Sequence, residues 1–355
     1  MNFLDYASTC PVVKYPQRLY RDVLGEGYFF NPNANYAYKE KRLLSKTENR
    51  VKKAIGAKGG KVIFGGTSSQ LIENLFTRVY EETNEYLTIC SIYEHDSVWR
   101  FADQWGDIDS LKHVIQTYHG DKQLIICLMG VNNLTGEIFP IKEIGKLCHE
   151  HDAFYICDMT AMIGKVPIPV NIDRWCDCAV WSGHKLGTEL GIGAMWISDR
   201  LDKLLDGFKL HGTPNLAGAL AMTQAVEDAC GISLLEERQA QWMDLSDELY
   251  SRLLDVCPNV KQIGNNEGCW AINAIRLPGF NADALQQYLA SKQIYVSIGG
   301  SACAEKHDYR VLNAYGLSND EASEVIRVSF GEDSSVEDVE ALVEGIKNFK
   351  ELYLK

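Results

Sequence analysis

The middle of the chain alternates short apolar runs with segments of helical periodicity. The runs are apolar at nearly every position, which is typical of strands that are buried on both faces of a sheet. They lie at residues 62–64, 86–92, 124–129, 153–157, 178–181 and 194–197. Between two of these runs, residues 141–151 carry apolar side chains at helical spacing. This strand–helix–strand order predicts a mostly parallel central sheet in an α/β domain.

The last third of the chain has a different pattern, in which one long helical segment is followed by shorter strand candidates. These elements lie at about residues 234–256, 270–277, 294–297 and 325–330. The chain closes with an amphipathic helix, for which Ser335 and Asp338 are a candidate capping pair. We therefore expect a large α/β domain at residues 15–228 and a smaller α+β domain made of residues 1–14 and 229–355.

Composition and charge exclude several classes of protein. The 355 residues are 46% hydrophobic, which is enough to bury a sizeable core. The formal net charge is −13 without a basic stretch, which argues against nucleic acid and anionic membranes as partners. No window holds the roughly 18 apolar residues that a membrane-spanning helix needs. The first residues do not resemble a signal peptide, so we expect a cytoplasmic protein.

The 11 cysteines are odd in number and scattered, mostly inside apolar runs. This usage is typical of reduced thiols in a cytoplasmic protein rather than of a disulfide framework. Cys176 with Cys178, and Cys148 beside His149 and His151, are the most closely spaced candidate ligands. Zinc needs two well-spaced ligand pairs, and these residues do not supply them, so we expect no metal site.

Two of the predicted strands end in residues that suit an anionic, aromatic ligand. Ser68 and Ser69 follow a strand and a glycine pair, where small residues and free N–H groups at a helix start bind phosphate. Asp158 ends another apolar strand, at the sheet edge where α/β proteins place ligands. In isolation, the first segment also fits an ordinary serine-capped turn, and Asp158 also fits a helix N-cap.

Two further residues carry candidate covalent chemistry. Lys185 follows the strand after that of Asp158, 27 residues later, and a lysine there could form a Schiff base. Cys303 lies among the small residues 299–304, where a thiol could move and reach solvent, as a nucleophile must. The alternatives are a surface lysine and a structural cysteine.

Taken together, these segments resemble class V pyridoxal 5′-phosphate (PLP)-dependent transferases, and specifically the cysteine desulfurases, over nearly the whole chain. The segments with the resemblance are Phe3–Pro11, Asn31-Pro32, Glu94-His95, Val131–Gly136, Ser182–Lys185, Gly212–Asn215, Gly300–Cys303 and Ile326–Ser329. Each one alone is weak, and their shared order makes the family specific. The resemblance implies the PLP-dependent transferase fold, of the type I, aspartate-aminotransferase-like kind.

The resemblance also implies roles for individual residues. Lys185 would carry the cofactor, Asp158 would pair with the protonated pyridine nitrogen, and His95 would stack on the ring. Arg327 would clamp the substrate carboxylate beside Asn133. The full set of implied cofactor-binding residues is Ser68, Ser69, His95, Asn133, Asp158, Ser182, His184, Lys185 and Thr213, with Lys185, Cys303 and His95 catalytic and Arg327 and Asn133 substrate-binding.

The implied reaction converts L-cysteine to L-alanine and transfers the sulfur to Cys303 as a persulfide. A sulfur-acceptor protein would then take that sulfur. Thr213 would reach the cofactor phosphate of a neighbouring subunit, which implies a homodimer.

The sequence departs from the family pattern at three places. Ala161 stands where the family usually has a glutamine within reach of the PLP phenolic oxygen, and Thr160 precedes it. Leu210 and His211 replace the usual residues before Gly212, and the loop after the cysteine motif is shorter. Two alternatives therefore stay open: another class V enzyme, such as a cysteine or selenocysteine lyase, epimerase or aminotransferase, that uses Lys185 without Cys303, and a non-catalytic binding protein that keeps the fold.

Overall fold

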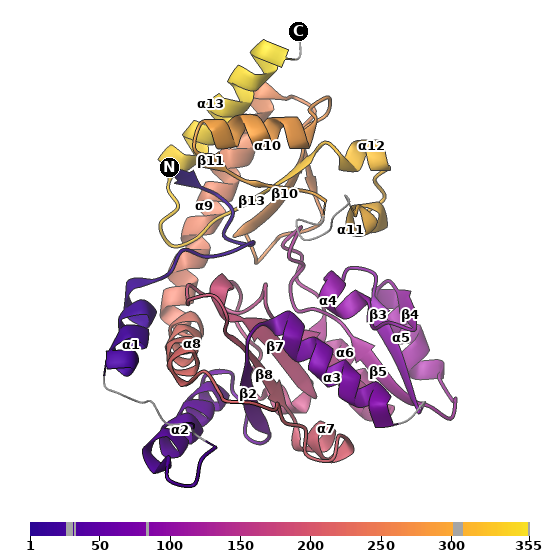
Figure 1. Cartoon of the computed structure of the whole chain (residues 1–355). Helices are drawn as coiled ribbons and strands as arrows, with labels where there is room; N and C mark the ends of the chain where they lie inside the picture. Colours follow the sequence, from indigo (N-terminus) through magenta and orange to yellow (C-terminus); the bar gives the residue numbers. More distant parts are fainter. Residues whose placement is uncertain (26–30, 32, 83–84, 301–307, 354–355) are drawn as a thin grey trace. The chain divides into compact units, whose positions relative to one another are not determined.

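A computed structural model describes residues 1–25, 31, 33–82, 85–300 and 308–353 (Figure 1). The chain divides into two compact units. The large unit consists of residues 11–130 and 139–232, and the small unit consists of residues 1–10, 131–138 and 233–355. No helix among the described residues is long and apolar enough to cross a membrane.

A seven-stranded sheet forms the centre of the large unit, in the order β2-β8-β7-β6-β5-β3-β4. Its strands are β2 (Lys61–Gly65), β3 (Tyr86–Ser91), β4 (Gln104–Gly106), β5 (Gln123–Cys127), β6 (Phe154–Asp158), β7 (Cys178–Ser182) and β8 (Gly193–Ile197). Strands β4, β3, β5, β6 and β7 are parallel to one another, and β8 pairs antiparallel with both β7 and β2. The prediction of a mostly parallel α/β sheet is confirmed.

Helices lie between and beside these strands. They are α1 (Lys14–Gly25), α2 (Tyr38–Ala54), α3 (Ser68–Glu82), α4 (Asp96–Trp99), α5 (Ile108–Thr117), α6 (Ile141–Glu150), α7 (Asp199–Leu204) and α8 (Leu216–Ala229), with short 3-10 turns η1 (Ile172–Arg174) and η2 (Gly183–Lys185). The periodic segment between β5 and β6 forms the helix that the sequence predicts there, and this crossover is what allows the two strands to run parallel.

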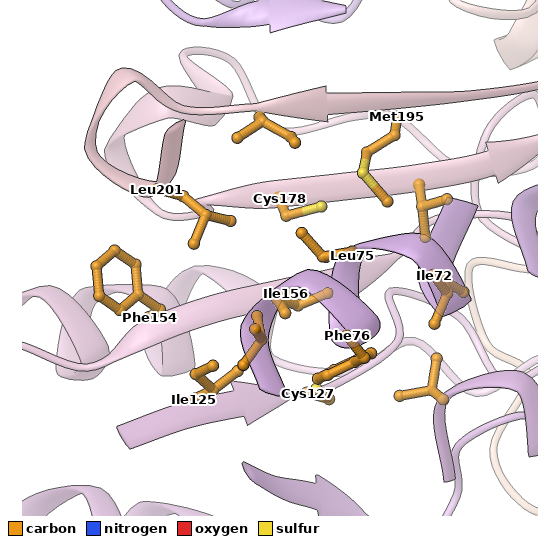
Figure 2. Packing of buried hydrophobic residues seen from close by; sticks show 14 of the residues in the cluster. Ile72, Leu75, Phe76, Ile125, Cys127, Phe154, Ile156, Cys178, Met195 and Leu201 are labelled. Carbon is orange, nitrogen blue, oxygen red and sulfur yellow. The ribbon is translucent and has the colours of Figure 1, made fainter. Parts of the chain in front are cut away.

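One continuous row of side chains ties the sheet to α3. Cys90, Cys127, Ile156 and Cys178 are neighbours in register across β3, β5, β6 and β7, and all of them are buried. Figure 2 shows three of these side chains lying against the apolar face of α3, which includes Phe76. Small sulfur-containing side chains let the helix approach the sheet closely, so the core is dense directly behind the strand ends.

The small unit contains two sheets and its own set of helices. One sheet has the antiparallel order β12-β13-β10-β9, and the other pairs β1 with β11 in parallel. The strands are β1 (Asn2–Phe3), β9 (Lys261–Ile263), β10 (Ile272–Arg276), β11 (Ile294–Tyr295), β12 (Ser297–Ile298) and β13 (Val325–Ser329), and the helices are α9 (Ile232–Val256), α10 (Ala282–Ser291), α11 (Arg310–Ala314), α12 (Asn319–Ala322) and α13 (Val336–Tyr353). The Ser335 amide and hydroxyl both donate to Asp338 Oδ2, as the capping pair predicts.

The unit boundaries lie within four residues of the predicted domain ends, and they also differ at one internal segment. Residues 131–138 lie within the predicted large domain, whereas their contacts place them in the small unit. The segment is a tight hairpin in which the Asn132 amide donates to the Glu137 carbonyl at 2.8 Å. At its tip, Gly136 has a φ of +78° and lies so close to β10 that a Cβ atom would be 2.5 Å from the Ile272 carbonyl oxygen. Only glycine suits that conformation and that approach.

The packing of α6 yields a test of the large unit's core. A Cβ atom added at Gly145 would lie 1.8 Å from the Trp175 carbonyl oxygen, and a backbone atom cannot swing aside. Gly145→Ala should therefore lower the free energy of unfolding by at least about 2 kcal/mol. Urea denaturation measures this. Gly25→Ala is the control, because nothing lies within 4 Å of its added Cβ, and it should stay within roughly 0.5 kcal/mol of the wild type. Equal stability of Gly145→Ala and the wild type would contradict the packing.

Candidate active site

Neighbouring parallel strands bring two of the predicted residues to the same edge of the large unit's sheet. β6 ends at Asp158 and β7 ends at Ser182, and Asp158 is opposite Val180 in the register of the two strands. Lys185 follows Ser182 at the end of η2. Because parallel strands end at one edge, the carboxylate and the lysine segment emerge on the same side of the sheet, where α/β proteins bind ligands.

Asp158 has one oxygen committed to the fold and one available for a ligand. The residue is 8% exposed, and its Oδ1 accepts a hydrogen bond from the Thr160 amide at 2.8 Å. Within the described part of the chain, its second oxygen accepts no hydrogen bond. The local capping role that the sequence left open is therefore real, and it uses only half of the carboxylate's acceptor capacity.

The loop that carries Lys185 is held tightly behind β7. The Gly183 amide donates to the Ile192 carbonyl, and the Gly183 carbonyl accepts from Leu186 and Thr188. A Cβ atom at Gly183 would lie 2.3 Å from Thr188 Oγ1, so only glycine fits between β7 and this loop. The backbone beside Lys185 is therefore fixed, which limits the positions that its amino group can reach.

His184 is kept neutral by its surroundings. Burial lowers the pKa of its imidazole below 6.5, and the adjacent Lys185 charge lowers it further. Near neutral pH this side chain can therefore donate from one ring nitrogen and accept at the other.

The start of α3 has the features of a phosphate-binding helix end. Thr67 Oγ1 accepts from the Gln70 amide at 3.0 Å, so Thr67, rather than either of the two serines, caps the helix. The amides of Ser68 and Ser69, the first two helix residues, have no acceptor inside the helix and lie at its positive end. Gly193 of β8 packs against the backbone of this turn, where a Cβ atom would be 2.6 Å from the Thr67 carbonyl carbon. The serines therefore form the start of α3 rather than its cap.

His95 and Glu94 are fixed at the start of α4. His95 is the N-cap residue, and its Nδ1 accepts from the Ser97 amide at 3.2 Å, which leaves the ring proton on Nε2. Glu94 is 1% exposed, and its Oε1 accepts from the Ser91 hydroxyl and from the Met129 amide. These bonds set the orientation of the imidazole that the sequence predicts as a ring-stacking partner.

Arg327 lies in the small unit, where it is almost completely buried on β13. Its Nη1 donates to the Asn133 carbonyl oxygen at 2.9 Å, and its Nη2 donates to Asp5 Oδ1 at 2.8 Å. The hydroxyls of Ser8 and Ser297 also contact Nη2 and donate to the same Asp5 oxygen. Asp5 therefore supplies the counter-charge for this guanidinium.

The Arg327 network also shows what the sequence analysis missed. Asp5 follows the first short strand and is 322 residues from its partner, so only the fold reveals the pair. Asn133 contributes its backbone carbonyl, while the Asn132 side chain closes the hairpin by accepting from the Leu134 and Thr135 amides. Arg327 Nε is buried without an acceptor among the described residues, so the guanidinium retains capacity for an anionic ligand.

Thr213 is exposed on the single chain, and the neighbouring Gly212 carbonyl accepts a hydrogen bond from Asn33 Nδ2 at 2.9 Å. Cys303 lies outside the described residues. Among the residues that the structure covers, no group of three or more histidine, cysteine or acidic side chains could hold a metal ion.

Comparison with known proteins gives the family. The family model described as aminotransferase class-V matches residues 7–342. This chain belongs to the aminotransferase class-V family. Like other members of the family, it uses PLP as its cofactor.

Two relatives of this class-V chain are named as cysteine desulfurases. It is 28% identical to a probable mitochondrial cysteine desulfurase of Dictyostelium discoideum, over 97% of this chain and 82% of that one. It is 26% identical to the cysteine desulfurase IscS of Mannheimia succiniciproducens, over 98% and 92%.

Solved structures show the same fold. A NifS-like protein from Rickettsia africae is 21% identical, matches over the full length of both chains and has a TM-score of 0.85. A cysteine desulfurase from Thermococcus onnurineus is 19% identical, matches over 98% of this chain and 94% of that chain, and has a TM-score of 0.79. The predicted PLP-dependent transferase fold is confirmed.

The residues of this class-V protein fit PLP. Asp158 offers a buried carboxylate oxygen for a pyridinium nitrogen, and the start of α3 offers amides for the phosphate. A buried hydroxyl without a partner, on Thr160, adjoins that carboxylate. When bound, PLP supplies the electron sink for bond breaking at the amino acid Cα.

The substitution Asp158→Asn separates the two roles of this side chain, which are to hold the turn and to pair with the cofactor. Asp158→Asn can still accept from the Thr160 amide, so the turn and the bound cofactor should be retained, but an amide cannot stabilise a pyridinium charge. We expect turnover to fall by roughly 10²–10³-fold. Absorbance of bound PLP and steady-state rates measure the two effects, with the distant Asp173→Asn as the control. Turnover near that of the wild type would mean that Asp158 serves only the turn.

Proposed function

We propose that this protein is a cysteine desulfurase that converts L-cysteine to L-alanine and transfers the sulfur to Cys303 as a persulfide. The observation that carries the proposal is that Asp158 and the Lys185 loop emerge at one edge of the sheet, in a chain that also has the cysteine motif at residues 300–303. The identities of the full-length relatives support it.

Four residues would bind the cofactor, bind the substrate or transfer the proton. Lys185 holds the cofactor covalently through Nζ, and Asp158 keeps the ring nitrogen protonated. Arg327 binds the substrate carboxylate through the N–H groups that its own network leaves available. The Lys185 amine, or His95, takes the proton from the substrate Cα.

Sulfur transfer then needs a second nucleophile. The Cys303 thiolate attacks the substrate sulfur, the S–S bond of the persulfide forms, and the C–S bond breaks. The electron pair of that bond stays on the former cysteine Cβ, which gains a proton and becomes the methyl group of alanine. Only a thiolate performs this attack well, so the reaction depends on an accessible, ionised Cys303.

Most of the other cysteines that the structure describes are poor competitors for this role. Eight of these ten are buried, and only Cys10 and Cys230 are partly exposed. Burial raises the pKa of seven thiols: Cys127, Cys148, Cys157, Cys176, Cys178, Cys230 and Cys257. For Cys230 the value is about 12. Because the thiolate is the reactive form, a limiting amount of alkylating agent should modify Cys303 first.

Cys303→Ser tests the assignment of the sulfur acceptor. We expect this variant to bind PLP and L-cysteine normally but to form sulfide, alanine and persulfide at least about 100-fold more slowly, because a hydroxyl does not accept sulfur. Purified protein is incubated with L-cysteine, with and without a thiol reductant, and the sulfide and alanine formed are measured. Cys230→Ser is the control and should behave as the wild type. Sulfide release at the wild-type rate by Cys303→Ser would identify a lyase or a related class V enzyme instead.

We further propose that the enzyme works as a homodimer in the cytoplasm and passes its sulfur to an acceptor protein. Thr213 supports the dimer, because an exposed residue in a family phosphate-binding segment is suited to reach a neighbouring subunit. Eight of the described cysteines, which are all of them except Cys10 and Cys269, are free thiols, and this is consistent with a reducing compartment.

Subunit mixing tests the contribution of Thr213. Lys185→Ala and Thr213→Ala should each be impaired alone, and a mixed dimer should regain one working site that takes its lysine and its threonine from different chains. The control is Lys185→Ala mixed with Asp158→Asn. These two residues belong to one chain's large unit, so each site in that mixed dimer keeps one defect and activity should not return. A fully active monomer by light scattering would exclude the dimer.

A further inference from the structure

Thr160 carries a buried hydroxyl that the protein itself does not satisfy. The residue is 8% exposed, and its backbone amide donates to Asp158 Oδ1. Its Oγ1 is shielded from water and has no hydrogen-bond partner in the described ranges of the chain. A buried polar group without a partner lowers stability, and this one lies on the turn of the Asp158 carboxylate, so its hydroxyl is suited to a partner that binds from outside the chain.

The other buried threonines of the described residues do not share this property. Each of them uses its hydroxyl in a hydrogen bond of 2.8–3.2 Å. They are Thr47, Thr88, Thr135, Thr188 and Thr223. Two of these, Thr47 and Thr223, lie inside helices and donate to the carbonyl four residues earlier. The fold therefore satisfies threonine hydroxyls wherever it buries them for structural reasons, and Thr160 is the exception.

The turn after β6 offers no other side chain that could meet a ligand through a hydrogen bond. Residues 159–163 are Met, Thr, Ala, Met and Ile, so Thr160 has the one polar side chain among them. Ala161 is buried and presents only a methyl group. A ligand that pairs with Asp158 thus meets a single hydroxyl donor on the same turn.

We propose that the Thr160 hydroxyl donates a hydrogen bond to the phenolic oxygen of the bound PLP ring. The proposal rests on the proposed pairing of Asp158 with the ring nitrogen, which places the ring against this turn. The phosphate lies on a flexible arm that the start of α3 can hold, and the phenolic oxygen is then the remaining acceptor on the ring itself. That oxygen carries negative charge, so a buried hydroxyl gains a charge-assisted bond there.

Such a hydrogen bond shifts the pH titration of the bound cofactor in a known direction, and this shift can be measured without turnover. A hydrogen-bond donor at the phenolic oxygen stabilises the deprotonated form of the bound cofactor. Removing the donor therefore raises the pH at which the visible absorption band of the cofactor changes halfway. The expected rise for one hydrogen bond is about one pH unit. The affinity for PLP should fall by roughly 10- to 100-fold for the same reason.

The experiment titrates the visible absorbance of the holoenzyme with pH and measures the dissociation constant for PLP. Thr160→Val removes the hydroxyl and keeps the shape of the side chain, and Thr160→Ser keeps the hydroxyl. We expect Thr160→Val to show the raised midpoint and the weaker binding, with Thr160→Ser close to the wild type. Thr223→Val is the matched control, because it removes a buried hydroxyl that already has a protein partner, and its midpoint should not move.

A wild-type midpoint and a wild-type PLP affinity in Thr160→Val would overturn the proposal. If the valine variant does not fold, Thr160→Ala removes the same hydroxyl and has to show the same shift, and an unshifted alanine variant overturns the proposal equally. Failure of the proposed PLP site itself would give a result that can be distinguished from failure of the Thr160 hydrogen bond. In that case the wild type lacks the visible band, or the band persists in Lys185→Ala.

Discussion

The burial of the parallel strands on both faces is the constraint on which the rest of the large unit depends. Cys90, Cys127, Ile156 and Cys178 form one unbroken row of buried side chains beneath α3, and such a row has no place for a charged group. The charged side chains of these strands, Lys61 and Asp158, therefore lie at strand ends. Since β6 and β7 run parallel, their ends meet at one edge, and the sheet thereby gathers ligand-binding groups without any of them weakening its core.

Two buried aspartates of the large unit show how a structural carboxylate differs from one kept for a ligand. Asp177, just before β7 and thus at the other sheet edge, accepts from the Tyr155 amide at 3.0 Å and the Ser198 hydroxyl at 3.1 Å. Arg200 adds a charged donor 3.3 Å from its second oxygen. Asp158 receives one backbone amide. Among the described residues, the fold provides hydrogen-bond donors for both oxygens of Asp177 but for only one oxygen of Asp158. An unmatched carboxylate oxygen of this kind is expected where a positively charged ligand group binds.

The sequence predicted the parts of this protein that depend on local pattern. Six of the seven strands of the central sheet were predictable because their positions are nearly all apolar, whereas the short and largely exposed β4 was missed. Asp158 and Lys185 were predictable because Asp158 ends β6 and Lys185 comes three residues after β7. The place of residues 131–138 was not predictable, since it depends on contacts with β10 more than 130 residues away. The Asp5–Arg327 pair and the unsatisfied Thr160 hydroxyl are also tertiary facts, because a sequence does not reveal which polar groups lack partners. The role of Cys303 stays a prediction.

A chain with 11 cysteines that performs thiol chemistry must keep most of its thiols out of the reaction. In the large unit, burial keeps thiols unreactive in two ways. It blocks the access of other molecules to the thiol, and it raises the thiol pKa, as at Cys127 and Cys178. The same side chains fill the space between the sheet and α3, where a thiol behaves as a small apolar group. Selectivity for one cysteine then needs no unusual reactivity at that residue. The ionised fraction of an exposed thiol with an ordinary pKa is larger by orders of magnitude than that of a buried thiol with a raised pKa. A modest positive charge near such an exposed thiol is then enough to complete its activation.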